Sequence, residues 1–421
     1  MRHERAHRPT RGVAGPAAAL LAAAALLAVP AAAAGGSADD WPWYRGPERT
    51  GISSETGLLK AWPADGPKVI WKTSLGDGYS GISAVGGRLY TMYSKGGDEL
   101  LAAFDAVTGK PLWTTRVDAN RSDDQGDGPR STPTVEGEVV YAVGASGVLI
   151  AVKAPSGETL WRKDLKKEFG AQVPQWGVST SPLVEEDLVI VDAGGGPGKS
   201  IVALDKRTGA LRWSSYDDRP GYSAPIAVTL HEVRQILSFS GTSLVSVAPK
   251  DGKVLWRIPW KTSYDVNAAQ PIFIPPDKVF ISSSYDVGGA VYRISKKGDS
   301  FEAAEVWKTR VMKNHFNTSI YYDGHIYGFD DATLKCIDAL TGQEKWRTRG
   351  FMKGSLVLAD GKLFIFGERG QLALAQATPE AYKELSRTQI LETKTWTMPT
   401  LAGGRLYLRD QQVMLALDVK G

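Results

Sequence analysis

The sequence predicts an all-β fold, an eight-bladed β-propeller built from four-stranded antiparallel blades. The first observation behind this prediction is a motif that recurs at residues 103–113, 203–213 and 336–346. Each copy contains Asp-x-x-Thr-Gly, followed four residues after the glycine by tryptophan, and looser copies end at Trp161 and Trp256. We interpret the motif as a strand, a turn and a second strand, because Asp and Thr side chains bond turn amides and Gly adopts the left-handed conformation.

The second observation is the spacing of the tryptophans. With two degenerate copies included, the series stands at positions 71, 113, 161, 213, 256, 307, 346 and 396, with gaps of 39 to 52 residues. Short strands with a period of roughly 40 to 50 residues are typical of propeller blades. A large flat tryptophan on each outer strand would fill the space between neighbouring sheets.

Each repeat also begins with a two-strand pattern. Turns of Gly-Gly, Glu-Gly or Asp-Gly, at residues 86–87, 136–137, 323–324 and 360–361, separate alternating strands, and this is a strong hairpin signal. The C-terminal residues 404–418 supply strands but no following tryptophan strand, whereas residues 69–73 form an isolated one. Pairing the two ends would complete the eighth blade and leave no open edge. A seven-bladed ring is the alternative if one degenerate repeat is an insertion.

Two repeats depart from the pattern. The fifth is stretched between Val291 and Trp307 by residues rich in Lys, Gly and Glu. The seventh contains residues 378–385, Thr-Pro-Glu-Ala-Tyr-Lys-Glu-Leu, which we interpret as a short helical insert with proline in its first turn. Both are expected at the surface.

The N-terminal residues predict secretion. Four arginines precede an Ala/Leu-rich stretch and a run of small residues, so residues 1–34 are interpreted as a cleaved signal peptide rather than a membrane anchor. The expected location is periplasmic or extracellular, without stable membrane insertion. Residues 35–66, rich in aromatic side chains, are predicted to be an extension packed on the propeller with Trp41, Trp43 and Tyr44 buried, and residues 67–421 to be the propeller.

Composition excludes several function classes. The formal net charge of +4 falls to about +1 without the leader, so no basic excess favours nucleic acid. The single cysteine, Cys336, cannot form an internal disulfide and is expected to be buried. No zinc or other metal site is predicted, because the few histidines are dispersed. Residues 194–200 resemble a phosphate loop but lie between strands.

The repeated Ala-x-Asp-x-x-Thr-Gly-x-x-x-Trp copies resemble those of the pyrroloquinoline-quinone (PQQ)-like β-propellers. This group includes quinoprotein alcohol dehydrogenases and non-enzymatic BamB-type outer-membrane assembly proteins. The dehydrogenase resemblance implies PQQ, a calcium ion held by Glu, Asn and Asp, and often a vicinal cysteine pair, which this chain cannot form. Asn267, Asn314 and Asp330 are of the right type, without a confident match to the full set.

Candidate ligand residues fall in the loops that enter each inner strand or join the second and third strands. These loops would surround one mouth of the central channel. We predict a site for a polar or anionic ligand there; alternatively, the side chains satisfy one another around a water-filled channel. The candidates are Arg130, Gln175, Trp176, Asn314, His315, Asp330, Glu368, Arg369, Arg409 and Asp410.

Trp176 is the most informative candidate, because it stands outside the tryptophan period. It would either stack on a ligand or pack beneath a loop. Nearby, residues 123–128, Asp-Asp-Gln-Gly-Asp-Gly, place oxygen ligands at alternate positions as calcium loops do. The acidic residue expected at the twelfth position is Thr134, so a solvated acidic loop is the better interpretation.

These observations predict a non-catalytic binding or assembly scaffold that acts through the channel-mouth face. Its partner would be a protein or a small polar ligand, and we expect a monomer. The alternative is a quinoprotein-type dehydrogenase that oxidises an alcohol or sugar with PQQ and calcium. A role in binding sugars or polymers is a third possibility.

Overall fold

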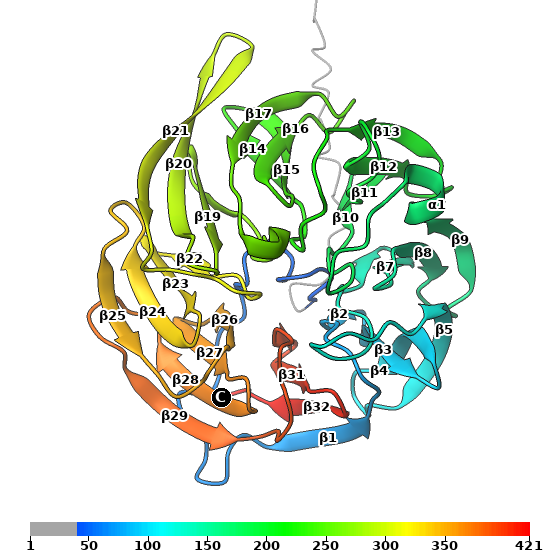
Figure 1. Ribbon diagram of the computed structural model, residues 1–421. Coiled ribbons are helices and arrows are strands. Elements are labelled where there is room, and N and C mark those ends of the chain that lie inside the picture. The colour runs from blue at the N-terminus through cyan, green and yellow to red at the C-terminus, as the bar shows by residue number, and fades with distance from the viewer. Residues whose placement is uncertain (1–39) are drawn as a thin grey trace, which may run out of the picture. The chain divides into compact units, whose positions relative to one another are not determined.

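Eight four-stranded antiparallel sheets stand in a ring in the computed structural model, which describes residues 40–421 (Figure 1). The expected eight-bladed propeller is confirmed, and the seven-bladed alternative is wrong. The proposed signal peptide lies outside the described residues. Within residues 40–421, the structure contains no helix with the length and apolar character needed to cross a membrane.

The first four blades follow the chain order from the inner strand outward. They consist of β2 (Ser83–Val85), β3 (Arg88–Lys95), β4 (Asp98–Asp105) and β5 (Pro111–Ala119); β6 (Thr134–Glu136), β7 (Val139–Val143), β8 (Val148–Lys153) and β9 (Thr159–Asp164); β10 (Leu183–Glu185), β11 (Leu188–Asp192), β12 (Ile201–Asp205) and β13 (Leu211–Ser215); and β14 (Ile226–Leu230), β15 (Val233–Phe239), β16 (Ser243–Val247) and β17 (Val254–Pro259).

Blades five to seven continue in the same way. They consist of β18 (Ile272–Ile274), β19 (Lys278–Ser283), β20 (Gly288–Lys297) and β21 (Ser300–Thr309); β22 (Ile320–Tyr322), β23 (His325–Asp330), β24 (Thr333–Asp338) and β25 (Glu344–Thr348); and β26 (Ser355–Ala359), β27 (Lys362–Phe366), β28 (Gln371–Gln376) and β29 (Glu384–Gln389). A helix α1 (Leu165–Phe169) and a 3-10 turn η1 (Ser263–Asp265) interrupt the loops.

The eighth blade joins the two ends of the ring. β30 (Thr400–Ala402), β31 (Arg405–Arg409) and β32 (Val413–Asp418) pair with β1 (Val69–Ser74) from the start of the propeller, as predicted. At the inner rim, the Thr400 hydroxyl donates to the Ile82 carbonyl at 2.6 Å, which links this blade to the first. The ring therefore closes both through a shared sheet and through an inter-blade hydrogen bond.

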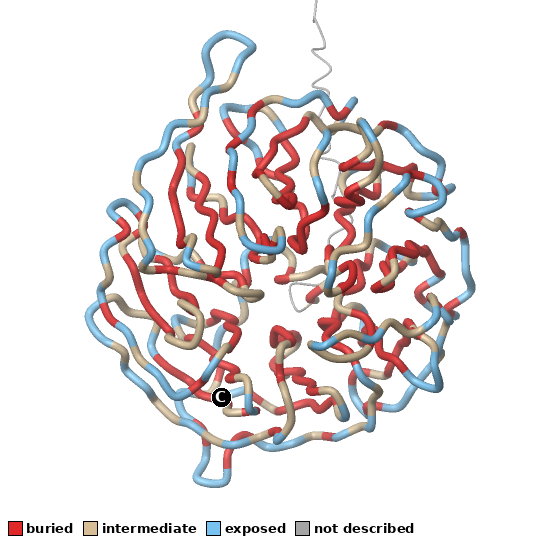
Figure 2. Tube along the Cα trace, in the orientation of Figure 1, coloured by how far each residue is buried: buried red, intermediate tan, exposed pale blue. Residues whose placement is uncertain are grey.

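Apolar side chains between the blades form the core. Figure 2 shows buried residues concentrated on the inner strands and exposed residues along the rim, as the alternation of β5, β9 and β13 requires. Five outer-strand tryptophans, at positions 71, 113, 161, 213 and 307, pack on the turn glycine of the following blade. A Cβ atom at Gly109 would lie 2.5 Å from the Trp71 ring, and the Trp71 indole donates to the Ala106 carbonyl. The recurring glycine and tryptophan are thus one packing unit.

The Asp-x-x-Thr-Gly turns have the expected internal bonds. Asp105 Oδ1 accepts hydrogen bonds from the Val107 and Thr108 amides and the Thr108 hydroxyl, and these bonds hold the pKa of the Asp105 carboxyl below its usual value. Gly109 adopts φ +69°, which lets the turn close against Trp71 without a side chain in the way.

Replacing Thr73 with valine is expected to lower the free energy of unfolding by about 1 kcal/mol. The Thr73 hydroxyl donates to the Gly109 carbonyl at 2.8 Å, which ties β1 to the first blade. Valine keeps the branched shape and removes the donor. Urea unfolding measures the change, and Thr114→Val at an exposed position of β5 is the matched control. Equal stability of both variants would contradict this role.

The N-terminal segment 41–53 closes the channel at the end opposite the mouth. Trp41 forms an antiparallel bridge with Ala84, and Ile52 forms a parallel bridge with Leu358. Between them, the buried guanidinium of Arg45 donates to the Thr318 carbonyl at 2.9 Å. In Figure 1 this segment, coloured blue, crosses the central opening. Of the aromatic residues expected to be buried, Trp41 is, whereas Trp43 and Tyr44 are half-buried.

Two local predictions are wrong. Residues 378–383 are not helical and lead directly into β29, because Tyr382 packs against Trp346 instead of completing a helical turn. Trp396 is not the tryptophan of an outer strand, since β29 carries no tryptophan and residue 396 lies in the loop that enters β30. The stretched fifth repeat is the long hairpin of β20 and β21, which projects from the ring in Figure 1.

Candidate functional site

The mouth of the central channel holds a cavity of about 440 Å³. Its side walls come from loops that enter the inner strands, and Tyr44 of the N-terminal segment lines it from the opposite end. Most of the large lining side chains are aromatic. They are Tyr44, Tyr79, Trp176, Tyr222, Tyr285, His315, Phe316 and Trp396.

These rings form an almost continuous arc around the mouth. Neighbouring ring centroids are 4.8 to 6.2 Å apart, within the range of favourable aromatic pairs. In order around the arc the residues are Tyr79, Trp396, Phe316, His315, Tyr285, Tyr264, Trp176 and Tyr222. The eight rings come from seven loops, with only His315 and Phe316 adjacent in the sequence, so the arc exists only in the folded propeller.

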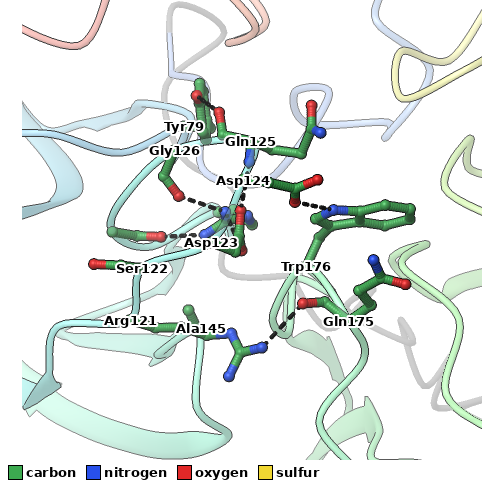
Figure 3. Close-up of polar contacts among 12 residues, drawn as sticks. Tyr79, Arg121, Ser122, Asp123, Asp124, Gln125, Gly126, Ala145, Gln175 and Trp176 are labelled. Atoms are coloured by element: carbon green, nitrogen blue, oxygen red, sulfur yellow. Dashed lines mark hydrogen bonds and ion pairs between the residues drawn. The ribbon is translucent and has the colours of Figure 1, made fainter.

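The loop of residues 121–130 closes the arc between Tyr79 and Trp176 (Figure 3). The Trp176 indole donates to the Asp124 carboxylate at 2.7 Å, and the Tyr79 hydroxyl donates to the Gln125 carbonyl at 2.5 Å. Inside the loop, Arg130 pairs with Asp123 at 2.7 Å and also donates to the Gly126 carbonyl. This loop is thus a folded support for the aromatic rings, with Asp123 half-buried and paired.

The position of Trp176 follows from the short turn that carries it. Gly177 adopts φ +75° against Ala145, and the Val178 amide donates to the Ala145 carbonyl. The Ala145 amide in turn donates to the buried carboxyl of Glu99 at 2.9 Å. A chain of contacts from the first blade therefore fixes the turn from which the indole extends into the mouth.

Two loops with the same sequence, Ser-Tyr-Asp-Val, supply a pair of tyrosines that the sequence analysis missed. They are residues 263–266 and 284–287. Tyr264 and Tyr285 both adopt left-handed backbone conformations, with φ of +61° and +57°, and their rings are 6.0 Å apart. Such conformations are costly for large residues and concentrate at functional sites. The repeated tetrapeptide was a signal that could have identified them.

Of the predicted site residues, Arg130, Trp176 and His315 line the cavity, and the other seven do not. Gln175 is exposed, and its carbonyl accepts from Arg121. Glu368 lies behind the wall, where it accepts from the Trp396 indole at 2.8 Å. Arg369 is exposed and its side chain makes no hydrogen bond within the described chain.

Asn314 and Asp330 support the fold around the mouth. The buried Asn314 amide donates to the Phe329 carbonyl and accepts from Ser319, which braces the entrance to the sixth blade. Asp330 pairs with the buried Lys335 at 2.8 Å. These polar groups satisfy neighbouring protein groups, as the alternative interpretation of the loops proposed.

Arg409 and Asp410 lie in the interior. Arg409 is 0% exposed, and Asp410 accepts the Gln412 and Val413 amides in the turn before β32. The Arg409 guanidinium donates to backbone carbonyls of the first blade, including Met92 at 2.7 Å. Sequence reasoning placed both residues in the mouth because their loop reaches that face.

The cavity lining carries positive charge and no carboxylate. Its ionisable cations are Arg130 and Lys353, and neither Asp nor Glu is among the lining residues. Arg130 is neutralised by Asp123, whereas Lys353 makes no ion pair within residues 40–421. Burial, reinforced by Lys353, lowers the pKa of His315 to about 4, so its imidazole is neutral at physiological pH. A third cation, Lys394, lies 4.2 Å above the Trp396 ring.

Comparison with known proteins identifies the family. The family model described as outer membrane protein assembly factor BamB matches residues 55–166 and 122–348. The chain belongs to this BamB family. A relative of that name from Burkholderia pseudomallei is 22% identical over 362 residues, which cover 84% of this chain and 78% of the relative.

Solved structures of a BamB protein and of a quinohemoprotein alcohol dehydrogenase show the same fold as this chain. BamB from Moraxella catarrhalis superposes with a TM-score of 0.59 at 15% identity, and covers 84% of this chain and 99% of its own. Quinohemoprotein alcohol dehydrogenase from Comamonas testosteroni gives 0.65 at 13% identity, and covers 91% of this chain and 81% of its own. At these identities the likeness concerns the fold and leaves activity to the site.

The residues of this BamB-family chain do not fit the calcium ion that the dehydrogenase resemblance implies. Calcium binds six to eight oxygen ligands, mainly carboxylates. The cavity lining has none, and residues 40–421 contain no group of three or more His, Cys, Asp or Glu side chains that could hold a metal. Asn267 and Asn314, the matching amides, are buried and bonded to backbone carbonyls.

Proposed function

We propose that the chain is a non-catalytic binding scaffold of the periplasm that holds a protein partner at its channel-mouth face. The observation that carries the proposal is the composition of the cavity, which is aromatic and free of carboxylates. Tyr, Trp, Phe, Met and Arg are the residues enriched at protein interfaces, and Asp and Glu are depleted there. Relatives named as outer membrane assembly factors support both the role and the location.

Site-specific photo-cross-linking tests this scaffold. A photoreactive amino acid at Tyr264, which is 64% exposed at the mouth, is expected to yield adducts with a protein in the periplasm of expressing cells. The matched control is the same amino acid at Leu340, which is 62% exposed in a turn on the opposite face. Adducts only at position 340, or none at position 264, would overturn the proposal.

A quinoprotein-type dehydrogenase is the second candidate function. It is favoured by Trp176, which stands outside the regular tryptophan spacing and lines a cavity that also contains cationic side chains. Because the lining offers calcium no carboxylate, we expect no saturable, calcium-dependent quenching of tryptophan fluorescence when PQQ is added. Trp176→Phe separates specific from nonspecific quenching. Calcium-dependent quenching that disappears in this variant would instead establish a cofactor site and justify a screen of alcohol and sugar oxidation.

A further inference from the structure

A second cavity, of about 540 Å³, lies between the fourth and fifth blades. Its walls come from the segment that follows β17, the loop between β19 and β20, and the end of β21. The loop of residues 284–287 also carries Tyr285 of the mouth cavity, so the two cavities share one loop. The lining residues of the second cavity are Lys261, Asp286, Val287, Lys308, Thr309 and Arg310.

This second cavity gathers positive charge. Lys261, Lys308 and Arg310 are exposed, and their side chains make no ion pair or hydrogen bond within the described part of the chain. Three cations and the Asp286 carboxylate give the lining a formal net charge of +2. Asp286 is also 3.7 Å from Lys313, outside the lining. Three like charges around one cavity repel one another, and an anion between them relieves that repulsion.

The position of Lys308 is set by a buried tryptophan. Its Nζ atom lies 4.6 Å from the centroid of the Trp260 ring. Trp260 is 2% exposed, and its indole donates to the Ser283 hydroxyl at 3.1 Å. Contact with the face of a ring orients an ammonium group without occupying it in a conventional hydrogen bond. The N–H donors of Lys308 are therefore held at the cavity and remain available to a ligand.

The loop that carries Asp286 is strained and closely packed. Tyr285 and Asp286 adopt φ of +57° and +61°, conformations that are costly for residues other than glycine and that concentrate at functional sites. Gly288 follows with φ +94°, and a Cβ atom there would lie 2.1 Å from the Thr309 carbonyl oxygen. The loop is thus fixed against the end of β21, which keeps Asp286 beside Lys308 across the cavity.

The donors of this cavity match a phosphate monoester better than a carboxylate. A phosphate monoester carries a charge of about −1.5 to −2 at pH 7 and three strong acceptor oxygens. Its charge fits the net charge of the lining, and its oxygens fit two ammonium groups and a guanidinium, which can bind phosphate with two donors. The half-buried Thr309 hydroxyl adds a further donor. A carboxylate, with one charge, would leave part of the lining charge unneutralised.

We infer that the cavity between the fourth and fifth blades binds a phosphate monoester group through Lys261, Lys308 and Arg310. This site goes beyond the proposed scaffold function and does not depend on it. The same group occurs on soluble compounds and on membrane lipids, and binding experiments with both kinds of ligand separate these sources.

Phosphorus-31 NMR with glycerol 3-phosphate tests the site on the full mature chain. At constant ionic strength, we expect saturable broadening of the phosphate resonance. Dimethyl phosphate, a diester with a single charge, should bind at least about fivefold more weakly. In protein containing 15N-labelled tryptophan, the Trp260 indole resonance is identified by its loss in Trp260→Phe. It should shift with the same saturation curve, because Lys308 lies on that ring.

Substitutions in the lining should act in opposite directions. Lys308→Gln and Arg310→Gln should each weaken binding of glycerol 3-phosphate about threefold to fivefold, since each removes one exposed cation from the site. Asp286→Asn should strengthen it about threefold, because this variant removes the lining carboxylate and asparagine tolerates the left-handed conformation. Lys72→Gln, at an exposed position of β1, is the control and should leave binding unchanged.

Co-sedimentation with phosphatidylcholine vesicles separates the two sources of phosphate. The vesicles contain either phosphatidic acid, a monoester, or phosphatidylglycerol, a diester. Binding to phosphatidic acid that is tighter than binding to glycerol 3-phosphate, per phosphate, assigns the site to a lipid headgroup. Equal or weaker binding to the vesicles assigns it to a soluble phosphate ester.

Three results would overturn the inference. The first is no saturable binding of glycerol 3-phosphate up to about 10 mM together with no binding to phosphatidic acid vesicles. The second is equal affinity for the monoester and the diester, and the third is equal affinity in Lys308→Gln and the wild type. Cross-linking at position 264 tests the scaffold separately, so either proposal can fail while the other stands.

Discussion

Replacing Arg409 with methionine is expected to lower the free energy of unfolding by about 3–5 kcal/mol. The guanidinium is fully buried, and burial lowers its pKa to about 10, so it is charged at neutral pH. Its donors reach the carbonyls of Gly76, Gly78 and Met92 at 2.7 to 3.2 Å. Arg409 thus ties the eighth blade to the first at the point where the ring closes.

Whether loss of Arg409 lowers or raises the free energy of unfolding depends on the hydrogen-bond acceptors that remain buried without a donor. Replacing a buried ion pair with apolar residues is often neutral or stabilising, because two desolvated charges disappear together. Here the partners are backbone carbonyls that cannot be removed, and each would remain buried without a donor at a cost of about 1–3 kcal/mol. Loss of hydrogen bonds therefore outweighs relief from burying the charge.

Urea unfolding measures this change, with Arg369→Met as the matched control. Arg369 is exposed and its side chain is unbonded within the described chain, so its loss should shift stability by less than about 0.5 kcal/mol. Arg409→Lys should be intermediate, because an ammonium has only three donors. If Arg409→Met and Arg369→Met unfold alike, closure of the ring does not depend on this guanidinium.

The sequence predicts the blades well because their physical causes are local and repeated. Asp105, Thr108 and Gly109 form a turn from bonds within five residues, and the tryptophan that covers the glycine recurs with the same period. The composite blade was predictable because the C-terminal blade lacked an outer strand, whereas the N-terminal end of the propeller had an isolated one. Trp396 shows the limit of this reasoning, since spacing alone cannot distinguish an outer-strand tryptophan from one in a loop.

The site was less predictable because burial is not visible in a loop sequence. Loop position alone suggested that Arg409 and Trp176 share the mouth, whereas their surroundings differ completely: one is enclosed by carbonyls and the other extends into the cavity. Lys353 carries no motif, and its position in the cavity lining depends on the packing of loops that are distant in the sequence. Tyr264 and Tyr285 were detectable, because their tetrapeptide repeats within 25 residues.

Stability should fall as pH rises from about 4 to 7, because two buried carboxyls are protonated in the folded chain. Burial raises the pKa of Glu99 and of Asp192 to about 7, and the residues are 0% and 4% exposed. In the unfolded chain these carboxyls release their protons near pH 4, so the unfolded state binds fewer protons between pH 4 and 7. Their stabilising contribution is complete below pH 4 and lost above 7.

The expected loss is about 3 to 4 kcal/mol for Glu99 and about 4 to 5 kcal/mol for Asp192, from about 1.4 kcal/mol for each pKa unit. The double variant Glu99→Gln, Asp192→Asn cannot ionise at these positions, and should show a flatter dependence of unfolding free energy on pH between 4 and 7. Urea unfolding at several pH values measures how the free energy of unfolding changes with pH. This slope is unaffected if the two amide substitutions change stability by the same amount at every pH. Glu158→Gln, an exposed residue paired with Lys153, is the control and should keep the wild-type slope.

Ionisation of Glu99 should also affect the loop that carries Trp176 at the channel mouth. Its carboxyl accepts the Ala145 amide, and the Ala145 carbonyl accepts the Val178 amide beside the Trp176 turn. Ionisation of Glu99 without an added partner favours opening of this contact, because a buried charge gains hydration when the loop moves. Hydrogen exchange at the Ala145 and Val178 amides should therefore accelerate above pH 7 beyond its intrinsic pH dependence, and should not do so in Glu99→Gln. Equal excess exchange in both proteins would show that Glu99 does not control this loop.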